Sequence, residues 1–174
     1  RAGGLRFRLR GGAIARFGTL GSTGTYWHSG LVAAPNGYLY GIPYDATSVL
    51  KMNINETVTS FGSLSGTAKW RGGVLANSGN IYGVPFSSTT VLKINTSNDS
   101  TSTFGSVTGT SKYHSGVLAP NGHIYCIPYD ATTVLKINTS NDTVSTFGSL
   151  TGTTKWHGGV LAPNGMIYGI PRDS

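Results

Sequence analysis

A repeat of about 43 residues constrains the fold of this 174-residue chain more than any other feature of its sequence. The repeats are headed by the aromatic residues Trp27, Trp70, Tyr113 and Trp156. Each heads a segment such as WHGGVLAPNGMIYGIP, and in the complete repeats a VLK segment and a segment ending in Phe-Gly follow it. A period of this length is typical of one blade of a β-propeller, a unit that buries its apolar surface against its neighbours.

Each repeat contains four short runs with strand character. In the third repeat these runs are 115–119, 123–128, 133–137 and 143–147, which we name strands A to D. Asn121-Gly122 separates A from B, and this dipeptide favours a type I′ hairpin. No segment carries the stripe of an amphipathic helix. We therefore expect an all-β propeller of four-stranded antiparallel blades with strand A innermost, in either a complete or an incomplete ring. A parallel β-solenoid is the alternative.

The repeats divide the chain into a basic N-terminal arm and a propeller region. The expected boundaries are 1–12 for the arm, 13–18 for strand D of a preceding blade, about 19–61, 62–104 and 105–147 for the repeats, and 148–174 for a partial repeat. An unpaired strand edge at 167–170 would be a template for association. We expect either a homo-oligomer or filament built through this edge, or a longer chain with further blades.

The net charge of +7 belongs mainly to the arm, and composition otherwise indicates an ordinary folded protein. Five arginines supply much of this charge: Arg1, Arg6, Arg8, Arg10 and Arg16. The remainder is close to neutral, so we expect no nucleic-acid partner. No apolar run is long enough for a membrane helix, and the single Cys126 excludes an intrachain disulfide.

The sequence pattern GxIYxIP, VLKI and TVxxFG resembles the blades of gluconolactonase, NHL and virginiamycin B lyase-type propellers. The resemblance implies the fold. It carries over no active site, because lactonase-type metal sites need carboxylates at the channel and the one Glu, Glu56, falls in a C–D connection. We expect no catalytic site, no metal and no cofactor.

Five Asn-x-Ser/Thr triplets occur, and all lie between strands C and D. Their asparagines are Asn55, Asn95, Asn98, Asn138 and Asn141. Exposed loops suit N-glycosylation, which would make this a eukaryotic protein that is secreted or bound to the cell surface. The alternative is that these residues only form turns.

Propeller topology sorts the connections onto two faces, with A–B and C–D on one and D–A and B–C on the other. The second face collects Trp27, His28, Trp70, Arg71, Tyr113, His114, Trp156 and His157 from D–A connections, and Tyr44, Asp45, Tyr129 and Asp130 from B–C connections. Aromatic rings with a few polar groups suit a carbohydrate or peptide ligand.

Each of these residues also has a structural interpretation. The Trp and Tyr residues would pack between blades, and Asp45 and Asp130 would form turns. The histidines could form a metal ring, which the cation of Arg71 would oppose. We further expect Lys51, Lys93 and Lys136 to form a solvated row, and Cys126, at the position of Gly41, Gly83 and Gly169, to be an inert buried thiol.

These features favour a non-enzymatic, extracellular, glycosylated repeat scaffold that self-assembles into a coat or filament. A lectin-like propeller that binds carbohydrate or peptide is the first alternative. A propeller lyase or lactonase is the second.

Overall fold

The structure is a computed structural model that describes residues 6–10, 13–17, 26–28, 30–55 and 57–173. It is all-β, and its strands form five antiparallel sheets. Three sheets have four strands each: β3 (Leu31–Ala33), β4 (Leu39–Gly41), β5 (Val49–Met52) and β6 (Val58–Phe61); β7 (Trp70–Leu75), β8 (Ile81–Pro85), β9 (Val91–Asn95) and β10 (Ser100–Phe104); β11 (Tyr113–Leu118), β12 (Ile124–Pro128), β13 (Val134–Asn138) and β14 (Thr143–Phe147). Two sheets have two strands each: β1 (Arg6–Arg10) with β2 (Ala13–Phe17), and β15 (Trp156–Leu161) with β16 (Ile167–Pro171).

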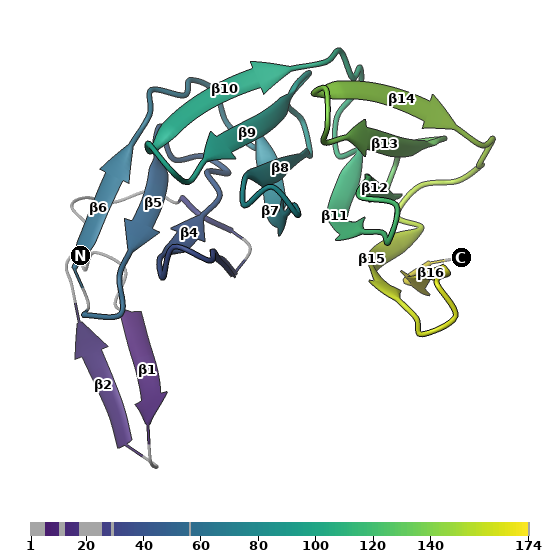
Figure 1. The fold of residues 1–174 in the computed structure, drawn as a ribbon. Coiled ribbons are helices and arrows are strands. Elements are labelled where there is room, and N and C mark those ends of the chain that lie inside the picture. Colours follow the sequence, from purple (N-terminus) through teal and green to yellow (C-terminus); the bar gives the residue numbers. More distant parts are fainter. Residues whose placement is uncertain (1–5, 11–12, 18–25, 29, 56, 174) are drawn as a thin grey trace.

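This arrangement confirms the propeller blades and excludes the parallel solenoid. In each four-stranded sheet the strands pair in the order of the sequence, always antiparallel. The blades follow one another along an open arc, with β1 and β2 at one end and β15 and β16 at the other (Figure 1). Strand A is innermost, since β7, β11 and β15 contact one another from blade to blade.

The strand boundaries agree with the repeat analysis to within one or two residues. β14 has the predicted limits, 143–147. β11 begins at Tyr113, two residues before the predicted start. Tyr113 pairs with Pro128 beyond a register shift that precedes Ser115, so the strand continues past an irregularity that the sequence does not announce.

The A–B hairpins differ from the predicted type I′ turn. In the third blade the Gly122 amide donates to the Ala119 carbonyl, and Gly122 has a φ of 79°. Asn121 is not among the residues with positive φ. Pro120 requires a negative φ at the first central position, so the loop is a type I turn followed by a left-handed glycine.

The apolar core lies between neighbouring blades. One cluster joins Tyr82 and Val84 of the second blade to Tyr113, Ile124 and Leu135 of the third. A similar cluster joins the first blade to the second. The described residues include no helix that could cross a membrane.

The expected basic arm contains a strand. Arg6–Arg10 forms β1, which pairs with β2, the predicted strand D at 13–17. In this register Phe7 and Leu9 take the positions that Leu135 and Ile137 take in the β13–β14 pair, because Phe17 corresponds to Phe147. The alternation of Arg with Phe and Leu is therefore the pattern of a strand, whereas the arm was expected from the charge of this segment. The remaining positions of 1–12 lie outside the described residues.

Candidate functional site

The two ends of the blades carry different chemistry. We name the end with the D–A and B–C connections the aromatic face, and the end with the A–B and C–D connections the sequon face. In the second blade Trp70 pairs with Pro85 at one end of the sheet, and Asn95 pairs with Ser100 at the other. The triplets and the aromatic heads of the repeats are thus on opposite faces, as the topology predicts.

The aromatic heads of the repeats pack into the structure, with Trp70 and Tyr113 buried and Trp27 and Trp156 half-buried. Trp70 is 3% exposed, and its indole Nε1 donates to the Thr90 carbonyl at 2.7 Å. Tyr113 is 1% exposed. Trp27 donates in the same way to Ser48, and Trp156 lies against Gly169. These side chains hold the blade together, which leaves the next position of each repeat to carry surface chemistry.

That next position holds His28, Arg71, His114 and His157, and the last three meet at the inner edge of the aromatic face. The Arg71 Nη1 atom lies 2.6 Å from His114 Nε2. Because a guanidinium only donates, His114 Nε2 accepts this hydrogen bond. The His114 ring stacks on Tyr129 with 4.0 Å between centroids, and His157 meets it edge-on at 4.7 Å. His114 is therefore a neutral, fixed imidazole.

Burial is the main reason that the pKa of His114 falls to about 4, and the neighbouring charges of Arg71 and His157 lower it further. At neutral pH His114 thus has a lone pair for Arg71 and no charge of its own. The positive charge of this cluster rests on Arg71.

Further rings continue the cluster across the blades. Phe86 lies under the Arg71 guanidinium, with 5.4 Å between Cζ and the ring centroid. Tyr44 links Phe86 to the exposed His28. On the other side Arg172 donates to the Tyr129 hydroxyl at 2.9 Å. The aromatic face is thus a continuous band of rings and cations.

The two predicted aspartates serve the contact between blades. Asp45 Oδ1 accepts from the Ala68 amide at 2.6 Å, and Asp130 Oδ1 accepts from the Thr154 amide at 2.7 Å. Both amides belong to the next D–A connection, at residues with positive φ. The predicted turn role extends across the blade boundary, and a role for either carboxylate in ligand binding stays a prediction.

Three buried lysines on this face were missed by the sequence analysis. Lys69, Lys112 and Lys155 directly precede the aromatic heads, in AKW, SKY and TKW. Lys69 Nζ donates to the carbonyls of Tyr44, Ala46 and Gly66 at 2.7–3.2 Å. Burial lowers the pKa of Lys69 and lowers that of Lys112 to about 8. Their recurrence was visible in the repeat, but a lysine before a Trp or Tyr ordinarily indicates an exposed loop.

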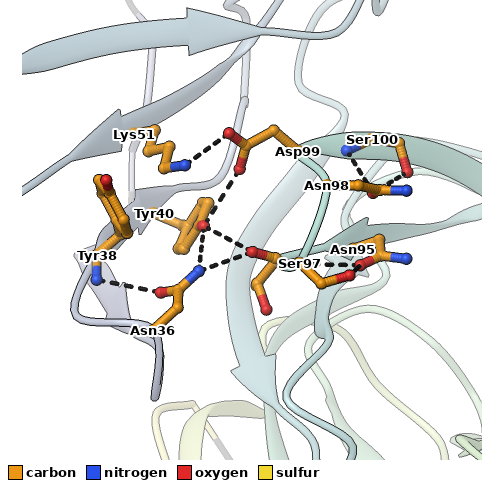
Figure 2. Close-up of polar contacts among 10 residues, drawn as sticks. Asn36, Tyr38, Tyr40, Lys51, Asn95, Ser97, Asn98, Asp99 and Ser100 are labelled. Carbon is orange, nitrogen blue, oxygen red and sulfur yellow. Dashed lines mark hydrogen bonds and ion pairs between the residues drawn. The ribbon is translucent and has the colours of Figure 1, made fainter.

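Neighbouring blades are also joined at the sequon face, as Figure 2 shows for the first and second blades. Asp99, at a φ of 55°, receives the Lys51 ammonium at 2.6 Å and the Tyr40 hydroxyl at 3.4 Å. Lys93 and Tyr82 contact Asp142 of the third blade in the same way. The predicted solvated row of lysines is therefore wrong for Lys51 and Lys93, because each pairs with a carboxylate more than forty residues away. Lys136 has no such ion pair among the described residues.

Two asparagines of the triplets, Asn95 and Asn98, lie beside the contact of Asp99. Asn95 Oδ1 accepts from the Ser97 amide and hydroxyl, and Asn98 Oδ1 accepts from Ser100 in the same way. No hydrogen bond of either Nδ2 atom is found in the described part of the chain, and Figure 2 shows both pointing away from the Asp99 contact. Asn98 and Asn141 are exposed, and so is Asn55. Glycosylation at these sites stays a prediction.

A metal ring is not formed by the described residues, which bring together no group of three His, Cys, Asp or Glu side chains suited to an ion. Arg71 takes the ring position beside His114 where a metal would need another neutral ligand. Cys126 is buried in the core, and burial raises its pKa.

The fold is similar to that of several propeller enzymes. A streptogramin B lyase matches with a TM-score of 0.77 and 16% identity over 92% of this chain and 52% of its own. The virginiamycin B lyase of Staphylococcus aureus matches with a TM-score of 0.73 and 13% identity over 95% of this chain and 62% of its own. A 6-phosphogluconolactonase-like protein of Bacteroides uniformis matches with a TM-score of 0.64 and 18% identity over 91% of this chain and 54% of its own. The chain thus spans between half and two thirds of the length of these proteins.

The same similarities bear out the resemblance seen in the repeat pattern, and at these identities they show the fold. No curated protein sequence matches the chain. The sequence profile of the DUF6923 family, described as a repeat of unknown function, matches residues 12–173. The chain therefore belongs to the DUF6923 repeat family.

Proposed function

We propose that this chain is a non-enzymatic, extracellular propeller scaffold that binds a carbohydrate through its aromatic face and carries N-linked glycans on its sequon face. The observation that supports the proposal most is the cluster of Arg71, His114 and His157. It places a cation that no described carboxylate pairs with, a neutral imidazole and an exposed ring side by side at the inner edge of the blades. Rings flanked by hydrogen-bonding groups are what a sugar surface requires.

Binding fits the aromatic face better than catalysis does. The carboxylates of Asp45 and Asp130 accept hydrogen bonds from backbone amides, and His114 is occupied by Arg71 and Tyr129. General acid–base chemistry needs a titratable group that can exchange a proton with the substrate. Lyase or lactonase activity is a weaker candidate, supported only by the fold. Elimination of a streptogramin B antibiotic by the purified chain, lost in His157→Ala, would establish it.

A glycan array tests the binding proposal. The purified chain is expected to bind a defined subset of glycans, and His157→Ala combined with Tyr129→Ala is expected to abolish this binding. Tyr38→Ala on the sequon face is the matched control, and it should leave binding unchanged. Absence of binding to any glycan, or equal loss in the control, would contradict the proposal.

The mass of the chain secreted from eukaryotic cells tests the location of the glycans. We expect a mass decrease on enzymatic deglycosylation, and a smaller decrease for Asn98→Gln combined with Asn141→Gln. A secreted chain with its unmodified mass would contradict glycosylation, while retention of the chain in the cytosol would contradict export.

Self-assembly is a second candidate, favoured by the strand edges. Val160, Tyr168 and Ile170 of β15 and β16 are 53–57% exposed, whereas the corresponding residues of the third blade are half-buried (Val117 and Tyr125) or buried (Ile127). The β1–β2 hairpin has the register of a C–D pair and would complete this sheet from a second copy, giving the head-to-tail contact of a ring or filament. Light scattering should show particles that grow with concentration and that Tyr168→Lys dissociates. A monomer at every concentration would exclude assembly.

A further inference from the structure

Arg71 breaks the repeat at the position where the structure brings charge to the aromatic face. The corresponding residues of the other repeats are His28, His114 and His157. Arg71 is half-buried on β7, and among the described residues no carboxylate lies within ion-pair distance of it. A partly buried guanidinium without a counter-ion is costly, because it loses water without gaining an opposite charge. A bound anion would compensate for that cost.

We propose that Arg71 binds the carboxylate of an acidic saccharide, a hexuronate, at the inner edge of the aromatic face. This inference rests on the proposed function and adds the charge of the ligand to it. A guanidinium presents a planar fork of N–H groups that matches a carboxylate bidentately. Among the described residues only Nη1 of this fork is engaged, since it donates to His114.

The neighbours of Arg71 fix the direction of this fork. His114 accepts from Nη1 and is itself held by the stacked ring of Tyr129 at 4.0 Å. The Phe86 ring lies 5.4 Å from the guanidinium carbon and makes a cation–π contact with it. A guanidinium held in this way loses little further freedom when it binds an anion. His114 is therefore a positioning residue, and Arg71 is the group that contacts the ligand.

The surrounding charges favour the same sign of ligand. Arg172, over the Tyr129 ring, adds a second cation to this face. Within the described part of the chain, Arg172 has an ion pair with Asp173 alone, which is 3.9 Å away and well exposed, so it neutralises Arg172 only weakly. Tyr129 and His157 supply the rings beside which the apolar edge of a sugar can lie.

Titration with tetragalacturonate and with its methyl ester tests the charge of the ligand directly. The two probes share one sugar backbone and differ in the carboxylate charge. We expect the acid to bind at least roughly tenfold more tightly than the ester, the factor expected for a charge-assisted hydrogen bond. Arg71→His, which restores the residue of the other three repeats, should remove this difference without unfolding the chain.

Two further variants separate the bidentate fork from charge alone. Arg71→Lys keeps the cation and should recover only part of the preference, whereas Lys136→Met removes a lysine of strand C and should leave it intact. Equal binding of acid and ester by the unaltered chain would overturn the role of Arg71 while leaving carbohydrate binding in place. Tight binding of oligoglutamate without binding of either sugar would overturn the choice of a saccharide, and with it the proposed function.

Discussion

Contacts on both the aromatic face and the sequon face join neighbouring blades, but the partners of the charged side chains differ between the two faces. On the sequon face a carboxylate of one blade receives the lysine and tyrosine of the blade before it, so the charges cancel. On the aromatic face buried lysines donate to neutral carbonyls, and Arg71 donates to a neutral imidazole. Among the described residues, Asp45 and Asp130 offset only part of the positive charge of the aromatic face, and Arg71 has no ion pair there, whereas Lys51 and Lys93 are both paired on the sequon face. This difference indicates which face is suited to an anionic ligand.

The largest expected effect follows from removing a buried lysine of the aromatic face. Lys69→Met keeps the apolar stem but leaves the carbonyls of Ala46 and Gly66 without the ammonium that donates to them, while the Tyr44 carbonyl keeps the Lys69 amide. Since hydrogen bonds from a charged group are costly to lose, we expect the free energy of unfolding, measured by urea denaturation, to fall by about 3 kcal/mol. Lys136→Met is the control. Equal stability of the two variants would show that the carbonyl contacts of Lys69 contribute nothing.

A smaller effect is expected where an aromatic head meets strand B. Tyr113 replaces Trp in the blade where Cys126 replaces Gly, whereas Trp156 packs directly on Gly169. Tyr113→Trp should overpack this site and cost about 2 kcal/mol. Adding Cys126→Gly should restore much of that loss, as a double-mutant cycle would show. Additive losses would contradict the pairing, and altered ligand binding would contradict the view that the heads only pack.

On the sequon face, loss of the carboxylate charge should cost less. Asp142→Asn retains a residue that tolerates the observed φ of 54° and removes the ion pair with Lys93. The pair is partly exposed, so solvent screens it, and we expect a loss of about 1 kcal/mol. Raised salt should reduce the difference between the variant and the unaltered chain. An effect as large as that of Lys69→Met would contradict the contrast between the faces.

The last expected effect is a dependence of stability on pH. Burial lowers the pKa of Lys112 to about 8, while an unfolded lysine titrates near 10.5. Between these values the unfolded chain binds more protons, so stability should rise with pH, by at most about 1.4 kcal/mol per unit. Urea unfolding between pH 8 and 10 measures this slope, and Lys112→Met should flatten it. Above pH 10 the raised pKa of the buried Tyr82 acts in the opposite direction. A free energy of unfolding that falls between pH 8 and 10 would contradict the lowered pKa of Lys112.

Local patterns in the sequence were enough to predict the blades and their faces. The alternation in VLKI, the Pro-Asn-Gly turns and the Phe-Gly ends recur with a fixed period, and each depends on residues close in sequence. The contacts between blades could not be predicted in this way. Lys51 and Asp99 meet across 48 positions, so nothing near Lys51 indicates its partner. The predicted hairpin type was wrong because Pro120 requires a negative φ at the first central position of the turn, which the Asn-Gly dipeptide does not specify.

The same distinction between local patterns and contacts across blades applies to the candidate site. The repeat places His114, His157 and Arg71 at one position of successive blades, and this was visible in the sequence. That Arg71 donates to His114 depends on how two inner strands lie side by side, and so does the burial that keeps His114 neutral.

Hydroxyl-radical footprinting of the two faces with bound tetragalacturonate tests the central claim most directly. The account predicts protection of Tyr129 and His157 on the aromatic face, with Tyr38 and Tyr125 on the sequon side unchanged. Protection of Tyr38 and Tyr125, with Tyr129 and His157 reacting as in the free protein, would place the ligand on the wrong face and contradict the account.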